Sequence, residues 1–249
     1  VQGSAMITET LSQYSALMLF KQKYGDVNLR KVLKMELDSY LRGRSSEQVV
    51  ELPLMRVENQ KYIHYHKGAI VMMALVDLLG EERLNHALHN FVKRYKFTDN
   101  IYPTTQDLLA FITKDATKNE KEEIKRLFTE VNIYDIKTTD VLIKPIKNNQ
   151  YQVTITLEAK RFVTDGQGIE KQAPLSAMVD IGLFLANPED ISLSVKSHEN
   201  DNLLYLKKHR IKDGKNKITF VVSKKPLFVG VDPFVKLIDR DTDDNIVKL

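Results

Sequence analysis

The 249-residue chain has no cysteine, and this absence excludes disulfide bonds and thiolate ligands for a metal. It leaves the cellular compartment open, because exported bacterial proteins can also lack cysteine. No apolar run reaches the ~18 residues needed to cross a bilayer. A large charge excess is missing too. The net charge of +4, from 37 basic and 33 acidic residues, is too small and too evenly mixed to indicate a nucleic-acid partner.

A leader sequence is also lacking at the start of the chain. The first residues, VQGSAM, contain no initiator methionine at position 1 and none of the basic and apolar regions of a signal peptide. They lead almost directly into a helical pattern, so we expect a piece cut from a larger protein. The length suits two domains, and 43% apolar with 28% charged residues are typical of a soluble globular protein.

Apolar residues recur at helical spacing up to about residue 137. Glycine, the usual residue after a helix, stands where three of these patterns stop, at Gly25, Gly43 and Gly80. Pro103 and Thr104 give a start signal for a further helix. We therefore expect six helices, at about residues 5–24, 28–41, 64–79, 81–96, from 105 onward, and 119–131.

The pattern changes near residue 138, where side chains begin to alternate with the period of two of a half-buried strand. Turn signals such as Asn148-Asn149 and Asp213-Gly214 separate short segments of this kind, which favours a β-sandwich. The segments are YQVTITLEAKRFV, LSAMVDIGLFL, ISLSVKS, NLLYLKKHRI, KITFVVS and FVKLID. The sequence therefore predicts an α+β fold, with a helical part at 1–137 and a β-sandwich domain at 138–249.

Several familiar kinds of site lack support. The histidines show no H-E-x-x-H spacing, and there is neither a G-x-S-x-G motif nor a glycine-rich phosphate loop. His86 and His89 are three residues apart, and we interpret them as a helix surface rather than a metal pair. DRDTDDN, from Asp239 to Asn245, starts like a calcium loop, but Asp244 stands where glycine is needed and no twelfth-position glutamate follows. An acidic turn is the favoured interpretation.

Two residues leave a choice between structure and chemistry. Glu9 lies off the apolar row of the first helix, where a first-turn carboxylate is either favoured by the helix dipole or has a chemical role. Tyr65 lies with Tyr62 at the start of a strongly apolar helix. Such a tyrosine is either a half-buried aromatic or a hydrogen-bond donor to a developing oxyanion.

Both residues fall in stretches that resemble one family. ITETLSQYSALM resembles the L-N-E-G-F-A-x-Y helix segment of aminopeptidase-N-like zinc peptidases, the gluzincins. Glu9 and Tyr14 hold the glutamate and aromatic places, whereas Thr10 and Leu11 depart from the majority pattern. YHKGAIVMMALVDLLGEE resembles the family's Y-x-K-G-A-x-V-x-x-x-L-x-x-x-x-G motif. The matching positions there are Tyr65, Lys67, Gly68, Ala69, Val71, Leu75 and Gly80.

The resemblance extends to the β-rich half, which is similar to the sandwich that follows the peptidase domain. It is nearest to a bacterial branch in which the peptidase lies behind a transporter-permease-like membrane region, so it implies a membrane region in the parent protein. Residues 1–137 are then identified as the C-terminal part of a zinc-peptidase catalytic domain. The whole chain is expected to be a fragment of a zinc-dependent aminopeptidase that hydrolyses N-terminal residues of peptides.

In this family a catalytic zinc ion is held by two histidines of H-E-x-x-H and by one glutamate, with water in the fourth position. The resemblance implies that Glu9 is the glutamate ligand and that Tyr65 hydrogen-bonds the oxyanion. H-E-x-x-H and the glycine-rich exopeptidase motif would precede Val1, in the missing N-terminal part of the same polypeptide. We therefore expect this fragment alone to be inactive and to lack zinc. The alternative is a non-catalytic, peptidase-like scaffold or binding module.

Overall fold

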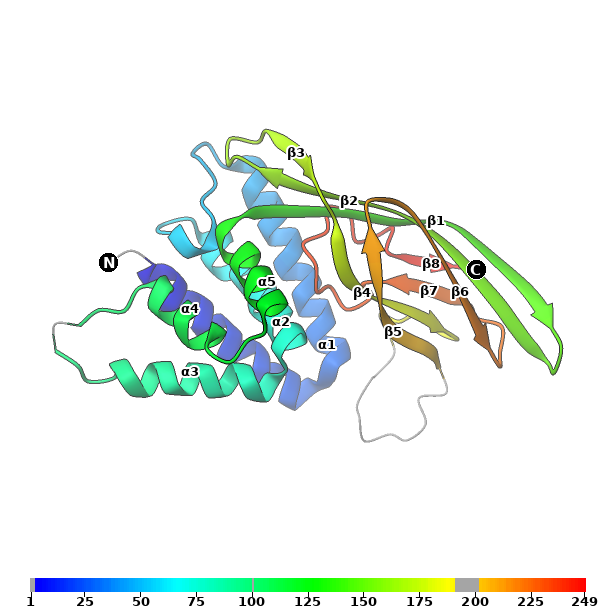
Figure 1. Cartoon of the computed structure of the whole chain (residues 1–249), viewed down its shortest axis with the longest axis horizontal. Coiled ribbons are helices and arrows are strands. Elements are labelled where there is room, and N and C mark those ends of the chain that lie inside the picture. Colours follow the sequence, from blue (N-terminus) through cyan, green and yellow to red (C-terminus); the bar gives the residue numbers. More distant parts are fainter. Residues whose placement is uncertain (1–2, 100, 191–201) are drawn as a thin grey trace. The chain divides into compact units, whose positions relative to one another are not determined.

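The computed structural model describes residues 3–99, 101–190 and 202–249. It confirms an α+β fold in which an N-terminal helical region is followed by two antiparallel sheets (Figure 1). The chain forms two compact units, and their limits differ from a single cut between 137 and 138. The first unit comprises Val1–Leu19, Met35–Asn132 and Thr164–Glu170, and the second comprises Phe20–Lys34, Ile133–Val163 and Lys171–Leu249.

The helical region follows the predicted pattern closely. The label α1 (Leu11–Ser46) covers two helical stretches that meet at Gly25, whose φ of 79° and ψ of 174° are not helical. Glycine adopts such a positive φ at little cost, so the predicted stop at Gly25 is confirmed. The other elements are η1 (Met6–Thr10), η2 (Leu54–Arg56), η3 (Tyr62–Lys67), α2 (Gly68–Leu79), α3 (Glu81–Tyr95), α4 (Thr105–Thr113) and α5 (Lys118–Thr129).

Local sequence signals fix where these helices begin and end. Thr104 forms a capping box with Asp107 at the start of α4, because each residue's backbone N–H donates to the other's side chain. Thr117 and Glu120 form the same box at α5. The helix α2 is apolar on nearly all sides and largely buried, so it is the central helix of its unit.

The strands form two four-stranded sheets. Strand β2 pairs with β6, β4 pairs with β5 and with β7, and β7 pairs with β8, all antiparallel. The first sheet contains β1 (Val131–Ile146), β2 (Gln150–Thr164), β3 (Glu170–Ala173) and β6 (Gly214–Val222). The second contains β4 (Ser176–Phe184), β5 (Leu203–Lys212), β7 (Phe228–Val231) and β8 (Ile246–Lys248). Strand structure thus begins at Val131, earlier than the expected change near residue 138.

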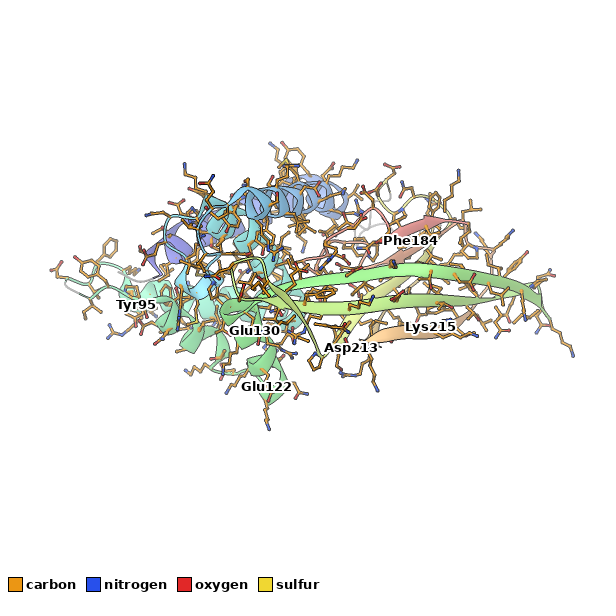
Figure 2. All side chains as sticks on the ribbon, turned by 90° about the horizontal axis from the view of Figure 1, so that it is seen from above. Tyr95, Glu122, Glu130, Phe184, Asp213 and Lys215 are labelled. Carbon is orange, nitrogen blue, oxygen red and sulfur yellow. The ribbon has the colours of Figure 1, made fainter. Side chains whose placement is uncertain are left out.

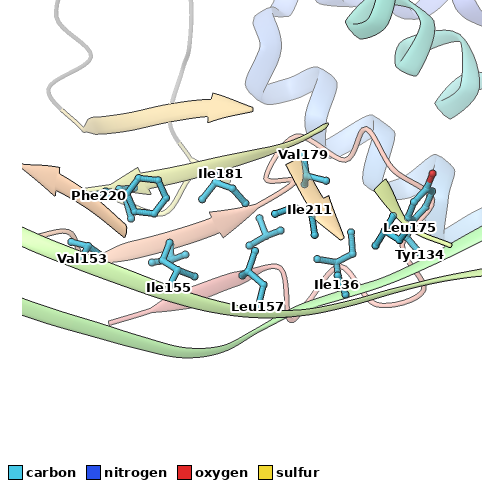
Figure 3. Close-up of a cluster of buried hydrophobic side chains, with 14 of the residues drawn as sticks. Tyr134, Ile136, Val153, Ile155, Leu157, Leu175, Val179, Ile181, Ile211 and Phe220 are labelled. Carbon is cyan, nitrogen blue, oxygen red and sulfur yellow. The ribbon is translucent and has the colours of Figure 1, made fainter. Parts of the chain in front are cut away.

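The sandwich core confirms the period-two pattern in β2 but not in β4. Every second residue of β2 from Val153 to Ala159 is buried, and Thr156 between them is buried as well. In β4 all six residues from Val179 to Phe184 are buried, so this stretch is covered on both faces. Figure 3 shows Val153, Ile155 and Leu157 of β2 gathered with Val179 and Ile181 of β4 in one buried cluster. Phe184, labelled in Figure 2, is the last residue of β4, and two glycines leave room for its ring. A Cβ at Gly182 would lie 2.3 Å from that ring, and one at Gly230 would lie 3.1 Å from it.

One predicted strand is wrong. FVKLID at 234–239 forms no strand, and the chain pairs instead through Phe228–Val231 just before it. The cause is a turn at Asp232, whose φ is 43° and whose carboxylate accepts the backbone N–H groups of Lys236 and Leu237 at 2.8–3.1 Å. Val235 also has a positive φ of 55°. The predicted strand ISLSVKS lies outside the described residues.

Candidate active site around Glu9 and Tyr65

The two residues singled out from the sequence lie in contact. The hydroxyl of Tyr65 donates a hydrogen bond to Oε2 of Glu9, although 56 positions separate the two residues. Both side chains are half-buried, which leaves part of each accessible from solvent. The phenol and the carboxylate therefore form one polar pair at the surface of the first unit.

Both residues lie on π-helical turns, an uncommon conformation. Glu9 lies in η1, directly before α1, and Tyr65 lies in η3, directly before α2. A π turn bonds residue i to i+5 instead of i+4, and such turns occur frequently at functional sites. Each turn changes the direction in which its side chains leave the helix. The sequence periodicity predicted ordinary helix at both places and gave no sign of these turns.

Close packing holds the two turns together. The hydroxyl of Thr10 donates to the backbone carbonyl of His64 at 2.5 Å, so the residue after Glu9 is tied to the residue before Tyr65. Gly68 permits this approach, because a Cβ there would lie 2.6 Å from Oγ1 and 2.7 Å from Cγ2 of Thr10. Thr10, which departs from the majority family pattern, is thus a structural link between the two turns.

His64 is a third polar residue of this site, and the sequence gave it no role. It is buried, its ring meets that of Tyr65 edge-on with centroids 4.6 Å apart, and its Nδ1 has no hydrogen-bond partner among the described residues. Burial lowers the pKa of His64, although the negative charge of Glu9 opposes the shift. The pKa of Tyr65 is raised, chiefly by its hydrogen bond to Glu9. Tyr65 is therefore a protonated donor at neutral pH.

Lys67 belongs to a separate buried cluster on the other side of η3. Its side chain is 1% exposed, and its Nζ lies 3.7 Å from Oε1 of Glu51 and 5.5 Å from the ring centre of Tyr40. Burial lowers the pKa of Lys67 to about 8, while the charge of Glu51 opposes that shift. Glu51 also accepts hydrogen bonds from the Tyr40 hydroxyl at 2.5 Å and from Nε of Arg44 at 2.8 Å.

Tyr62 lies with this buried cluster. Its ring stacks on that of Tyr40 with centroids 6.0 Å apart, and Gly43 makes room for it because a Cβ there would lie 2.4 Å from the Tyr62 side chain. Burial, followed by the charge of Glu51, raises the pKa of Tyr62. Of the two tyrosines at the start of the apolar helix, Tyr65 donates to Glu9, whereas the Tyr62 hydroxyl accepts a hydrogen bond from Nε2 of Gln60.

The residues that the structure describes do not by themselves complete a zinc site. In the described ranges, no three histidine, cysteine, aspartate or glutamate side chains converge on a place for a metal ion. Glu9 offers one carboxylate, and one of its oxygens already accepts the Tyr65 hydroxyl. Tetrahedral zinc needs further nitrogen, sulfur or oxygen ligands. Glu9 can therefore serve as one ligand of a zinc site whose other ligands come from elsewhere.

The other residues considered as metal ligands lie on a helix surface or in an acidic turn. His86 and His89 are exposed on α3. In the DRDTDDN segment, Asp239 is 1% exposed, and its carboxylate accepts the backbone N–H groups of Ile136 and Asp241 at 3.2 Å each. That carboxylate organises the acidic turn from within.

The sequence matches no family model and no curated protein. Among the residues that the structure covers, no helix combines the length and the apolar character needed to traverse a bilayer. The resemblance to gluzincins therefore stands on the two motifs, and the assignment of Glu9 and Tyr65 to zinc chemistry stays a prediction.

Proposed function

We propose that this chain is the C-terminal part of the catalytic domain, with the following β-sandwich, of a zinc-dependent aminopeptidase that removes N-terminal residues from peptides. In this proposal Glu9 is the zinc ligand on the helix after H-E-x-x-H, and Tyr65 is the oxyanion donor. The observation that supports it best is the hydrogen bond between Tyr65 and Glu9. An oxyanion donor and a metal ligand must lie within one small site, and these two side chains touch.

The local chemistry suits these roles. A bound zinc ion would polarise the scissile carbonyl and activate water for attack. The Tyr65 hydroxyl stays protonated at neutral pH, because the pKa of its phenol is raised by the contact with Glu9. A phenol has a single O–H, so in this proposal the hydrogen bond passes from Glu9 to the charge that develops on the substrate carbonyl. Thr10 and Gly68 hold the two turns at the distance that keeps this donor beside the carboxylate.

The proposal requires partners that this chain does not supply. Two histidine ligands and a general-base glutamate would come from H-E-x-x-H in the polypeptide before Val1. The substrate would be a peptide, and the resemblance to the bacterial branch adds a membrane region in the parent protein. Without those residues Glu9 is one ligand, so the isolated chain would carry neither zinc nor activity.

The test is made on the complete polypeptide. We expect it to contain H-E-x-x-H ending about 18 residues before Glu9, the spacing of the related ligand helices, to bind one zinc ion and to hydrolyse amino-acid anilides. Glu9→Gln should lose most of the zinc, because an amide is a poorer ligand than a carboxylate. Absence of H-E-x-x-H upstream, or a folded protein with neither zinc nor hydrolysis, would overturn the proposal and favour the non-catalytic scaffold.

A further inference from the structure

We infer that Lys67 is a positioning residue for Tyr65, because its buried ion pair with Glu51 fixes the rotation of η3 that directs the phenol toward Glu9. The inference rests on the proposed function for what the Tyr65–Glu9 contact does. Whether Lys67 maintains that contact can be measured independently of any reaction.

The first support is the opposite placement of two side chains on one turn. Tyr65 and Lys67 are two residues apart in η3, and their side chains meet different partners: Tyr65 meets Glu9 of η1, and Lys67 meets Glu51 and Tyr40. In a π turn of more than four residues, positions i and i+2 point to nearly opposite sides. A rotation of η3 that kept Lys67 on Glu51 could therefore not move Tyr65 far from Glu9.

The second support is that packing alone does not require a charged side chain at position 67. Its side chain is 1% exposed, and at a buried position a methionine or leucine would avoid the desolvation of an ammonium group. Nζ lies within ion-pair distance of Glu51 at 3.7 Å but has no hydrogen-bond partner among the described residues. Buried charge pairs often add little stability, and one attested use is to specify a single arrangement.

The third support is that Glu51 is itself firmly held. Its carboxylate receives the Tyr40 and Arg44 hydrogen bonds, and its backbone N–H donates to the carbonyl of Gly166 at 2.8 Å. Arg44 is fixed in turn by Glu170, with its Nη1 3.3 Å from Oε1 of that residue. Lys67 is thus tied to an anchored carboxylate, and its loss would release η3 while Glu51 kept two other partners.

The experiment uses the chain itself, labelled with ¹³C at the tyrosine ring carbon that bears the hydroxyl. The chemical shift of that carbon reports hydrogen bonding of the phenol, and Tyr65→Phe identifies its signal among the ten tyrosines. In Lys67→Met the Tyr65 signal should shift toward the position of a free phenol. The signals of Tyr134 and Tyr205, in the second unit, should stay in place. The matched control is Lys61→Met, because Lys61 is an exposed lysine at the start of the same turn.

A second variant guards against a folding defect. Glu51→Gln keeps the size of the side chain and an acceptor for Tyr40 but removes the counter-charge of Lys67, so it should shift the same Tyr65 signal. An unchanged Tyr65 signal in a folded Lys67→Met protein would overturn the inference. If neither variant folds, the pair holds the whole unit rather than Tyr65, and the inference is equally overturned.

The outcome is separable from that of the proposed function. In the complete enzyme, Lys67→Met should lower kcat by up to about 10²-fold with little change in KM, as expected when a donor is misplaced by an ångström or so. If the NMR signal shifts but the complete protein never hydrolyses peptides, the positioning role stands and the aminopeptidase proposal fails. If the signal does not move, the positioning role fails whatever the activity.

Discussion

The hydroxyl of Tyr65 donates a hydrogen bond to the carboxylate of Glu9 across a sequence separation of 56 residues. Two π-helical turns, one before α1 and one before α2, bring these side chains together. The contact between the turns depends on a side chain at position 10 and on the absence of one at position 68.

Gly68→Ala should destabilise the first unit. A Cβ at residue 68 would lie 2.6 Å from Oγ1 of Thr10, and overpacking of this kind typically costs about 1–3 kcal/mol. The backbone of Gly68 is already helical, with φ −55° and ψ −43°, so alanine would otherwise favour the helix. Urea unfolding of the two proteins gives the difference in the free energy of unfolding.

A double variant separates the steric cause from a general effect on the helix. Thr10→Ala removes the two atoms nearest to the added Cβ, at 2.6 and 2.7 Å. Gly68→Ala should therefore cost less in a Thr10→Ala background than in the wild type, because residues in contact are not additive. Equal costs in the two backgrounds would show that the collision with Thr10 is not what makes glycine necessary.

The stability of the sandwich should fall as pH rises from about 4 to 7. Burial raises the pKa of Asp239 to about 7, and the neighbouring charges of Asp232 and Asp244 add to the shift. The folded state therefore holds this proton more tightly than the unfolded chain, whose aspartate pKa is about 3.9. The contribution favours folding below that range and is lost as the group ionises, at up to about 1.36 kcal/mol per pH unit.

Asp239→Asn removes this ionisation, so the variant should lose less stability than the wild type between pH 5 and pH 8. Some dependence should remain, because burial also raises the pKa of Asp232 to about 7. Denaturant unfolding at the two pH values gives the slopes, and the exposed Asp140→Asn is the matched control. Identical slopes in wild type and Asp239→Asn would contradict the prediction.

The isolated chain should bind no zinc at Glu9 with micromolar or tighter affinity. A single half-buried carboxylate is one ligand, whereas structural and catalytic zinc sites need three or four from the protein. Calorimetry with wild type and Glu9→Ala distinguishes the cases. Binding that persists in Glu9→Ala comes from other surface groups, such as the exposed His86 and His89. Stoichiometric tight binding that disappears in Glu9→Ala would show this description of the site to be wrong.

The sequence predicted those elements whose signals are local. Thr104 with Asp107 marks the start of α4, and Gly80 marks the end of α2. Both helices lie where expected. The alternation of apolar side chains along β2 was likewise predicted from the sequence. The strand predicted at 234–239 was wrong, because Asp232 folds its carboxylate back onto the following N–H groups. No local sequence pattern predicted that turn.

The sequence identified the residues of the candidate site but did not predict how they are arranged. Glu9 and Tyr65 came from motif resemblance, and each has a structural alternative when considered alone. Their contact needs π-helical turns that a 3.6-residue periodicity does not reveal. The partner of Lys67 was also hidden, because Glu51 follows α1 in an irregular stretch without periodicity. Long-range pairing of charged residues leaves no mark on the local sequence pattern.

The sharpest prediction concerns Tyr65→Phe in the complete polypeptide and follows from the proposed aminopeptidase function. The substitution deletes only the hydroxyl, so the ring contact with His64 and the π turn should remain. Removing one oxyanion donor typically lowers turnover by roughly 10²–10³-fold. An interaction made only in the transition state lowers kcat and kcat/KM about equally. We expect full zinc content, nearly unchanged Tm and KM, and this loss of kcat.

Tyr62→Phe is the matched control, because Tyr62 stacks on Tyr40 in the buried cluster. If Tyr65→Phe retains more than about half of the wild-type kcat with zinc fully bound, Tyr65 is a structural residue and its match to the family motif carries no catalytic role.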